Sequence, residues 1–148
     1  MSSGEQTKPP EKWQNIRHLA GLIDGEGTFT ASPHYAPKAC KWYVDLRFVI
    51  HLAHTSEWEK IATYWQKIYR GKIYHIKLPL PRKPILRWAI YDINQLEKFL
   101  NDVTPYLTIK KQDAEKMKRF ITRYKLIPYR EKGQLNREKA KELWKKLF

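Results

Sequence analysis

The sequence predicts an α+β fold, with one antiparallel four-stranded sheet and helices packed on one of its faces. Segments with apolar residues at helical spacing alternate along the chain with pairs of segments in which apolar and polar residues alternate. These two periods are typical of helices and of half-buried strands. A strand with one apolar and one polar side fits an antiparallel sheet that is solvated on one face. The predicted order is helix, strand, strand, helix, strand, strand, helix, followed by two more helices.

The first helix is predicted over residues 12–24, where apolar residues recur at helical spacing. Gly25 and Gly27 are expected to end it, because glycine is common just past a helix C-terminus. Residues 1–11 contain two prolines and no apolar run, so we expect a flexible tail there. The rest of the chain, residues 12–148, is expected to form a single domain with a C-terminal helical extension.

Two strands and a second helix follow. Residues 28–34 and 42–50 show period-two alternation and are predicted to be strands. Ser56 and Glu59 have the spacing of a capping box, which predicts a helix that begins there. Gly71 is expected to end this helix, since glycine interrupts helical patterns.

The remaining elements are predicted from the same signals. Two strands are expected over residues 72–78 and 85–92, joined by a segment that contains three prolines. Asn94 and Glu97 form a second capping box that predicts a third helix. The two further helices are expected over residues 108–124 and after Asn136, which would cap the last one.

The composition points to a polyanionic partner. The formal net charge is +14, from 29 Lys and Arg against 15 Asp and Glu, which exceeds what solubility requires. No run is long and apolar enough for a membrane span, so we expect no membrane partner. A single Cys fits a reducing, intracellular and cytoplasmic location. The five His show no zinc-ligand spacing, because no Cys pair accompanies them.

The polar face of the predicted sheet is the candidate nucleic-acid surface. It combines hydrogen-bonding side chains suited to base edges with Lys and Arg suited to phosphates. An ordinary solvated sheet face is the alternative, because such faces also carry Thr, Arg and His. A strand of about nine residues spans about 30 Å, which corresponds to about nine base pairs of duplex. The candidate contact residues are Thr30, Ser32, His34, Tyr43, Asp45, Arg47, His51, Lys72, Tyr74, Arg82 and Arg87.

The end of the first helix is the most unusual stretch of the chain. Residues 19–27 read Leu-Ala-Gly-Leu-Ile-Asp-Gly-Glu-Gly. A helix C-terminus carries partial negative charge, so Asp24 and Glu26 are electrostatically unfavourable there. A bound cation, a basic partner or an exposed turn would each account for the two acids.

This stretch resembles the signature of the LAGLIDADG homing endonucleases. Gly25 stands where the family usually has Ala, and Glu26 replaces the second Asp but keeps a carboxylate. The order of elements over residues 12–124 is similar to the family's α-β-β-α-β-β-α domain, with its saddle-like sheet. Residues 104–112, Thr-Pro-Tyr-Leu-Thr-Ile-Lys-Lys-Gln, resemble the family stretch that holds an active-site lysine, here Lys110.

The resemblance implies a site-specific endonuclease that cleaves a long pseudo-palindromic duplex DNA as a homodimer and leaves short 3′ overhangs, and it suggests an intron-encoded protein. Glu26 and the carbonyl of Gly25 would bind Mg²⁺, or Mn²⁺ or Ca²⁺ in its place, and Lys110 would assist catalysis. The first helix would pack against its copy in a second subunit. The residues implied for this dimer interface are Leu19, Ala20, Gly21, Ile23 and Asp24.

Lys110 also stands out from the residue pattern alone. It falls on the same helical row as Ala114, Met117 and Ile121, and a cation in the first turn of a helix is unfavourable. Such local exceptions concentrate at functional sites. The alternative is that Lys110 extends along the sheet edge to solvent.

Some alternatives stay open. The family often has a polar residue at the end of the second strand, where this chain has Leu52 or Ala53. His51 or His54 would replace it, unless both are ordinary surface residues. Two other functions are compatible with this resemblance. One is an RNA-splicing maturase that binds intron RNA, and the other is a non-catalytic DNA-binding protein that would not need Glu26.

Overall fold

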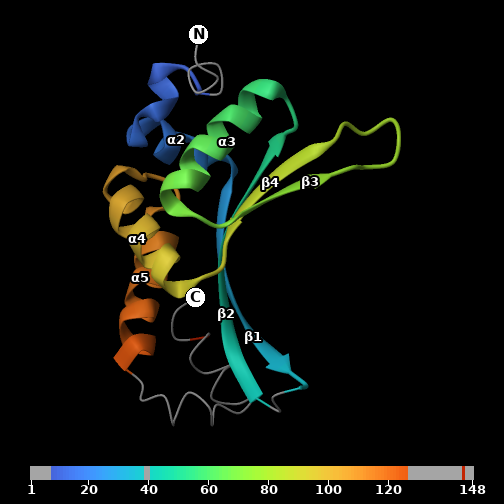
Figure 1. Cartoon of the computed structure of the whole chain (residues 1–148). Coiled ribbons are helices and arrows are strands. Elements are labelled where there is room, and N and C mark those ends of the chain that lie inside the picture. Colours follow the sequence, from blue (N-terminus) through green and yellow to red (C-terminus); the bar gives the residue numbers. More distant parts are fainter. Residues whose placement is uncertain (1–7, 39–40, 127–144, 146–148) are drawn as a thin grey trace.

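The computed structural model describes residues 8–38, 41–126 and 145, and it confirms the α+β fold (Figure 1). Within residues 8–126, as far as they are described, two short 3₁₀ helices and four α-helices accompany four strands. In chain order the elements are η1 (Glu11–Gln14), α2 (Ile16–Glu26), β1 (Gly27–Ala36), β2 (Lys41–Ala53), α3 (Ser56–Tyr69), β3 (Lys72–Ile76), β4 (Ile85–Ile90), α4 (Ile93–Val103), η2 (Thr104–Tyr106) and α5 (Lys111–Leu126).

The four strands form one sheet in the order β1-β2-β4-β3, and all neighbours are antiparallel. Two hairpins therefore lie side by side, with β2 and β4 at the centre. Figure 1 shows α3, α4 and α5 along one face of the sheet, and no helix within the described ranges covers the other face. We call this uncovered side the open face. The predicted arrangement of helices on a single face is confirmed.

An aromatic cluster joins the sheet to the helices. The ring of Phe48 on β2 lies 4.6 Å from that of Phe99 on α4 and 5.5 Å from that of Trp88 on β4, measured between centroids. The ring of Phe29 on β1 lies 5.3 Å from that of Phe48. These four side chains are almost fully buried. Such rings contribute both a large buried apolar area and edge-to-face contacts, so they fix how the helices sit on the sheet.

The first helix differs from its prediction at both ends. Asn15 breaks it into η1 and α2, and its side chain caps α2 by accepting a hydrogen bond from the backbone N–H of Arg17. At the other end α2 continues through Gly25 and ends at Glu26. Gly27 is the C-cap, and a Cβ there would lie 2.8 Å from Ile23 Cγ2. Close packing therefore explains Gly27, while Gly25 does not end the helix.

Part of the segment predicted as a tail, residues 8–11, lies within the described ranges. Pro9 is buried, and its carbonyl accepts a hydrogen bond from Gln14 Nε2. Pro10 precedes η1, and its carbonyl accepts a hydrogen bond from the backbone N–H of Trp13. Local hydrogen bonds thus join Pro9 and Pro10 to η1. Residues 1–7 lie outside the described ranges.

Both predicted capping boxes are wrong by one or two residues. Thr55, not Ser56, is the N-cap of α3, and its hydroxyl accepts the backbone N–H of Trp58. Asp92, not Asn94, caps α4. The glutamate of each predicted box has another partner. Glu59 interacts with two histidines, as described below, and Glu97 forms an ion pair with Lys125 of α5.

The later elements follow the predicted order with shifted limits. β3 and β4 are shorter than predicted, and α5 begins at Lys111 instead of residue 108. The turn after α3 contains Arg70 and Gly71, both with positive φ, and a Cβ on Gly71 would lie 2.3 Å from the carbonyl oxygen of Ala89. Only glycine fits this approach. The helix predicted after Asn136 lies outside the described residues, apart from residue 145.

None of the helices in the described ranges combines the length and the apolar character that crossing a membrane requires.

Candidate functional site

The strand register places the predicted contact residues of all four strands on the open face. Thr30 lies opposite Arg47, and His51 lies opposite Arg87, which in turn lies opposite Tyr74. Side chains at directly opposed positions of neighbouring strands lie on the same face of the sheet. Every second residue along each strand lies on that face as well. The same register brings the remaining predicted residues of the strands to this face, namely Ser32, His34, Tyr43, Asp45 and Lys72.

Exposure fits a binding surface. Thr30, Ser32, His34, His51 and Lys72 are exposed, and Asp45, Arg47, Tyr74 and Arg87 are half-buried. The side chain of Tyr43 lies outside the described part. Arg82 is exposed but belongs to the loop between β3 and β4. Within the described part, the sheet therefore presents these predicted contact residues of its strands on one side, and Arg82 lies in the loop at its edge.

Two arginines of the open face are held by aromatic rings. The guanidinium of Arg87 lies 4.6 Å from the ring centroid of Tyr74, and that of Arg47 lies 5.4 Å from the ring centroid of Tyr91. Arg47 also forms an ion pair with Asp45. Stacking and pairing reduce the side-chain freedom that would otherwise be lost when a ligand binds. The two guanidinium groups are thereby pre-oriented on the face.

The polar network around Arg87 is incomplete. Arg87 Nε is buried and has no hydrogen-bond partner within the described residues. Nearby, burial and then a hydrogen bond to Tyr74 raise the pKa of the Tyr91 phenol above its usual value. Sequence reasoning missed Tyr91. Its position four residues after Arg87, at the same period-two parity, was the signal that could have found it.

The two acids at the end of α2 have different surroundings. Asp24 is half-buried and accepts hydrogen bonds from the backbone N–H groups of Thr108, at 2.9 Å, and Lys110, at 2.9 Å. Glu26 is exposed, as is Gly25 beside it. Asp24 therefore joins the end of α2 to the segment just before α5 by hydrogen bonds. Glu26 and the Gly25 backbone form an exposed pair of oxygen donors at the junction of α2 and β1.

Lys110 immediately precedes α5. Its carbonyl accepts the first helical hydrogen bond, from Ala114, and its side chain is half-buried. The apolar row predicted to follow it is confirmed, since Ala114, Met117 and Ile121 are fully buried. The hydrogen bond from the Lys110 backbone to Asp24 fixes Lys110 next to the end of α2. The structure thus brings the two predicted catalytic residues into the same region.

The residues implied for a dimer interface divide into two groups. Leu19, Ala20 and Ile23 are buried in the core of the chain itself, at 1%, 0% and 0% exposure. These side chains are consequently not available for a partner. Gly21 is exposed, and a Cβ on Gly21 or on Gly25 would meet no atom within 4 Å. The free face of α2 is therefore the one that carries these two glycines, while Asp24 is used within the chain.

The two histidines near the end of β2 lie in different places. His51 belongs to the open face, opposite Arg87. His54 follows the strand and contacts Glu59 of α3. Leu52 is buried. Of the two candidates for the polar position near the active site, only His51 is therefore on the open face.

Comparison with known families identifies the class of protein. A family model described as LAGLIDADG endonuclease matches residues 19–127, which include the acidic end of α2 and Lys110. The fold is that of a DNA-binding endonuclease. The chain belongs to the LAGLIDADG endonuclease family. No curated protein sequence matches the chain significantly.

Solved structures of homing endonucleases share the fold. The enzyme I-CvuI, in complex with the I-CreI target in the presence of 2 mM Mg, is 19% identical with a TM-score of 0.63, and the match covers 89% of this chain and 93% of I-CvuI. The intron-encoded I-CeuI in complex with DNA is 16% identical with a TM-score of 0.66, covering 95% and 68%. The meganuclease I-CpaMI bound to uncleaved DNA is 24% identical with a TM-score of 0.63, and this chain spans only 41% of its length.

Proposed function

We propose that the protein is a homodimeric, metal-dependent homing endonuclease that cleaves both strands of a long pseudo-palindromic DNA site and leaves short 3′ overhangs. The observation that carries the proposal is the position of Glu26. This carboxylate is exposed at the end of the signature helix, next to the first residue of β1 and near Lys110. It thus lies where a duplex bound along the open face would pass.

The open face fits a DNA groove in length and chemistry. β2 has 13 residues, which corresponds to about 44 Å of strand. The half-buried guanidinium groups of Arg47 and Arg87 are suited to the O6 and N7 atoms of guanine. Arg87 Nε is a buried donor without a partner in the described residues, and rotation of the side chain on binding would let it donate to DNA or water. Lys72 and Arg82 at the edge are suited to phosphates.

The donors at the end of α2 suit a hard divalent cation. A carboxylate oxygen of Glu26 and the carbonyl of Gly25 would hold Mg²⁺, which usually binds one or two carboxylates together with phosphate oxygens and water. When bound, the ion would polarise the scissile phosphate and lower the pKa of an attacking water. I-CvuI was also crystallised with its target in the presence of 2 mM Ca, an ion that takes the same kind of ligand.

Lys110 would stabilise the charge that develops on the phosphate. The hydrogen bonds from Thr108 and Lys110 to Asp24 hold the backbone that carries this lysine. A fixed cation placed where charge develops lowers the barrier without reorganisation during the reaction. Asp24 is thus a positioning residue, and Glu26 and Lys110 are the catalytic residues.

A second copy of the chain would complete the enzyme. The chain carries one signature and thus one Glu26, while a double-strand break needs two cuts. The exposed side of α2 with Gly21 and Gly25 permits close approach of a second backbone. A two-fold axis along this contact would place two copies of Glu26 near each other. A symmetric dimer accounts for a pseudo-palindromic site.

The test is cleavage of a randomised duplex library in the presence of Mg²⁺, followed by sequencing of the cut ends and a binding assay on the recovered site. We expect Glu26→Gln to abolish cleavage while binding is retained, because this exposed carboxylate forms no hydrogen bond or ion pair within the described residues. We expect Lys110→Met to reduce cleavage by about 10²-fold. Glu57→Gln, an exposed glutamate in the first turn of α3, is the matched control.

Two outcomes would contradict the proposal. Undiminished cleavage by Glu26→Gln would exclude this residue as the metal-binding acid. If the wild-type protein cuts no duplex with Mg²⁺ present but binds intron RNA tightly, the maturase function is the correct one.

A further inference from the structure

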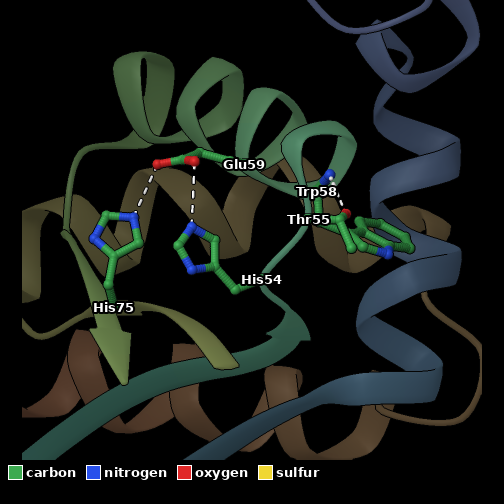
Figure 2. Close-up of polar contacts among 5 residues, drawn as sticks. All are labelled: His54, Thr55, Trp58, Glu59 and His75. Atoms are coloured by element: carbon green, nitrogen blue, oxygen red, sulfur yellow. Dashed lines mark hydrogen bonds and ion pairs between the residues drawn. The ribbon is translucent and has the colours of Figure 1, made fainter. Parts of the chain in front are cut away.

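Three side chains from two segments of the chain, residues 54–59 and β3, meet on the helix-covered side of the sheet, at its β3 edge. The Nε2 atom of His75 on β3 lies 2.9 Å from Oε1 of Glu59 on α3, and Nε2 of His54 lies 3.3 Å from Oε2 of the same carboxylate. One ligand atom from each residue can be chosen so that all three lie within 4.8 Å of one another. Figure 2 shows both imidazoles directed toward Glu59 from the same side.

This set of donors is chemically different from the one at the end of α2. Two imidazoles and one carboxylate are a ligand set of zinc sites, whereas Mg²⁺ prefers oxygen ligands. In a tetrahedral site with bonds of about 2.0 Å, neighbouring ligand atoms are about 3.3 Å apart. Both nitrogen–oxygen distances of the cluster are near this value. Small side-chain rotations would therefore suffice to enclose an ion.

The backbone pre-organises the cluster. His54 directly precedes Thr55, the N-cap of α3, and the backbone N–H of Glu59 donates to the carbonyl of Thr55. The backbone N–H of His54 donates to the carbonyl of Pro84, just before β4. His54 and Glu59 are thus fixed by one helix start, and His75 is the ligand from the neighbouring hairpin.

The cluster lies at the base of the arm, which we define as the loop of residues 77–84 between β3 and β4. This loop projects from the body of the molecule in Figure 1. Residues 69–88 contain six Lys or Arg and no acid. His54 and His75 also line a pocket of about 360 Å³ together with Leu80, Arg82 and Pro84 of the arm. The arm is basic, and the carboxylate beside its base is that of Glu59, which belongs to α3.

We propose that His54, Glu59 and His75 bind one divalent transition-metal ion, Zn²⁺ by preference, and that this ion fastens the base of the arm to α3. Three protein ligands leave the fourth tetrahedral position to water. The site is on the opposite side of the sheet from the open face, because His75 has the opposite parity to Tyr74. It is therefore a structural tie that stands independently of the proposed nuclease activity.

The linear sequence did not reveal this site. The five histidines lack zinc-ligand spacing, since the ligands come from the end of β2, from α3 and from β3. The glutamate was also assigned to a capping box with Ser56, which Thr55 replaces. Only the packing of α3 on the edge of the sheet brings the three residues together.

The experiment titrates Co²⁺ into tag-free, chelator-treated protein while excess Mg²⁺ occupies oxygen-only sites. We expect one equivalent per chain to give the visible absorption of four-coordinate Co²⁺, and Zn²⁺ to bleach it. His75→Gln and His54→Gln should each weaken binding by at least about tenfold. Glu57→Gln and His18→Gln, both at exposed positions, are the matched controls and should bind as the wild type does.

A second measurement tests the structural role. With Zn²⁺ at a hundredfold excess over its Kd, the Tm should rise by about 5 °C or more in the wild type and not in His75→Gln. Amide exchange in residues 77–84 should slow only when Zn²⁺ and both histidines are present. Absence of four-coordinate Co²⁺, or binding by both histidine variants that equals binding by the wild type, overturns the site. Metal binding without slower exchange in the arm overturns the role as a tie.

Discussion

The carboxylate of Asp24 accepts a hydrogen bond from the backbone N–H of Lys110 at 2.9 Å, across 86 positions of sequence. This contact resolves the electrostatic conflict seen in the sequence. Asp24 lies at the negative C-terminal end of α2, but it also lies at the positive N-terminal end of α5, which begins one residue after Lys110. An acid is favourable at that second end. The unfavourable position in one helix is offset by a favourable position against another.

Replacing Asp24 should loosen this junction. We expect Asp24→Ala to lower the free energy of unfolding by about 1–2 kcal/mol, because the backbone N–H groups of Thr108 and Lys110 lose their acceptor. Urea unfolding measures the change. Asp113→Ala, which removes an acid in the first turn of α5, should cost only a few tenths of a kcal/mol. Equal losses in the two variants would show that charge alone, and not the hydrogen bonds, stabilises the junction.

Two glycines of the signature should respond in opposite ways to substitution. Gly21→Leu should leave the fold of the single chain intact, since an added Cβ meets no atom within 4 Å, but should prevent dimerisation. Gly27→Ala should instead destabilise the fold, because its Cβ would lie 2.8 Å from Ile23 Cγ2 and 2.9 Å from the Ile23 carbonyl oxygen. Sedimentation and thermal unfolding separate these effects. A Gly21→Leu protein that still dimerises would exclude this face of α2 as the interface.

Arg87 should contribute to sequence specificity. Its guanidinium lies over the ring of Tyr74 on the open face. We expect Arg87→Ala to cost about 1–3 kcal/mol of discrimination at one base pair of each half-site. Relative binding to a panel of single-base variants of the target gives this quantity. Arg119→Ala, at an exposed position of α5, is the control and should leave the base preferences unchanged. A uniform loss across the panel would reassign Arg87 to phosphate contact.

Tyr69 should make stability depend on alkaline pH. Burial, and then the hydrogen bond at 2.9 Å to Asp102, raise the pKa of its phenol above the usual value. Below about pH 10 the phenol is neutral in both states, so its contribution is fully present. Above that pH the unfolded chain loses the proton first, and the free energy of unfolding falls as the pH rises toward the raised pKa.

The variant Tyr69→Phe tests this dependence. It should be less stable near pH 7 by about 1 kcal/mol, since the hydrogen bond to Asp102 is lost. At alkaline pH its free energy of unfolding should fall less steeply than that of the wild type. The difference in slope should be at most about 1.4 kcal/mol per pH unit, the value for one proton. Urea unfolding at a series of pH values measures both. Parallel alkaline curves for the two proteins would assign the loss to other groups.

Period-two alternation carried most of the fold prediction. The predicted contact residues of the strands lie on one face of the sheet. Their prediction did not depend on the exact strand limits, because alternate residues of a strand always lie on the same face. Helix starts were less predictable. Ser56 and Asn94 match the capping pattern, yet Thr55 and Asp92 accept the hydrogen bonds. Where several residues are competent to cap, tertiary packing decides which one does so.

In the candidate site, too, local features could be predicted from the sequence, whereas contacts between distant segments could not. The exposed position of Glu26 follows from the end of a helix, which is a local feature. The contact of Asp24 with Thr108 and the meeting of His54 with His75 depend on which helix lies beside which strand. The resemblance implied Leu19, Ala20 and Ile23 for a dimer interface, but the sequence does not show which side of the helix the core of the chain covers. The core of the chain itself covers them.

The alternation of the strands has a consequence for how such a protein changes its target over evolution. On β1, Phe29 and Ala31 belong to the core, while Thr30 and Ser32 alternate with them along the strand and lie on the open face. Mutations at the intervening positions leave the packed side chains untouched, so recognition can drift with little effect on folding. If these positions read DNA, as we propose, a lineage that moves to a new genomic site can exchange them one at a time. Each intermediate along that route remains a folded protein.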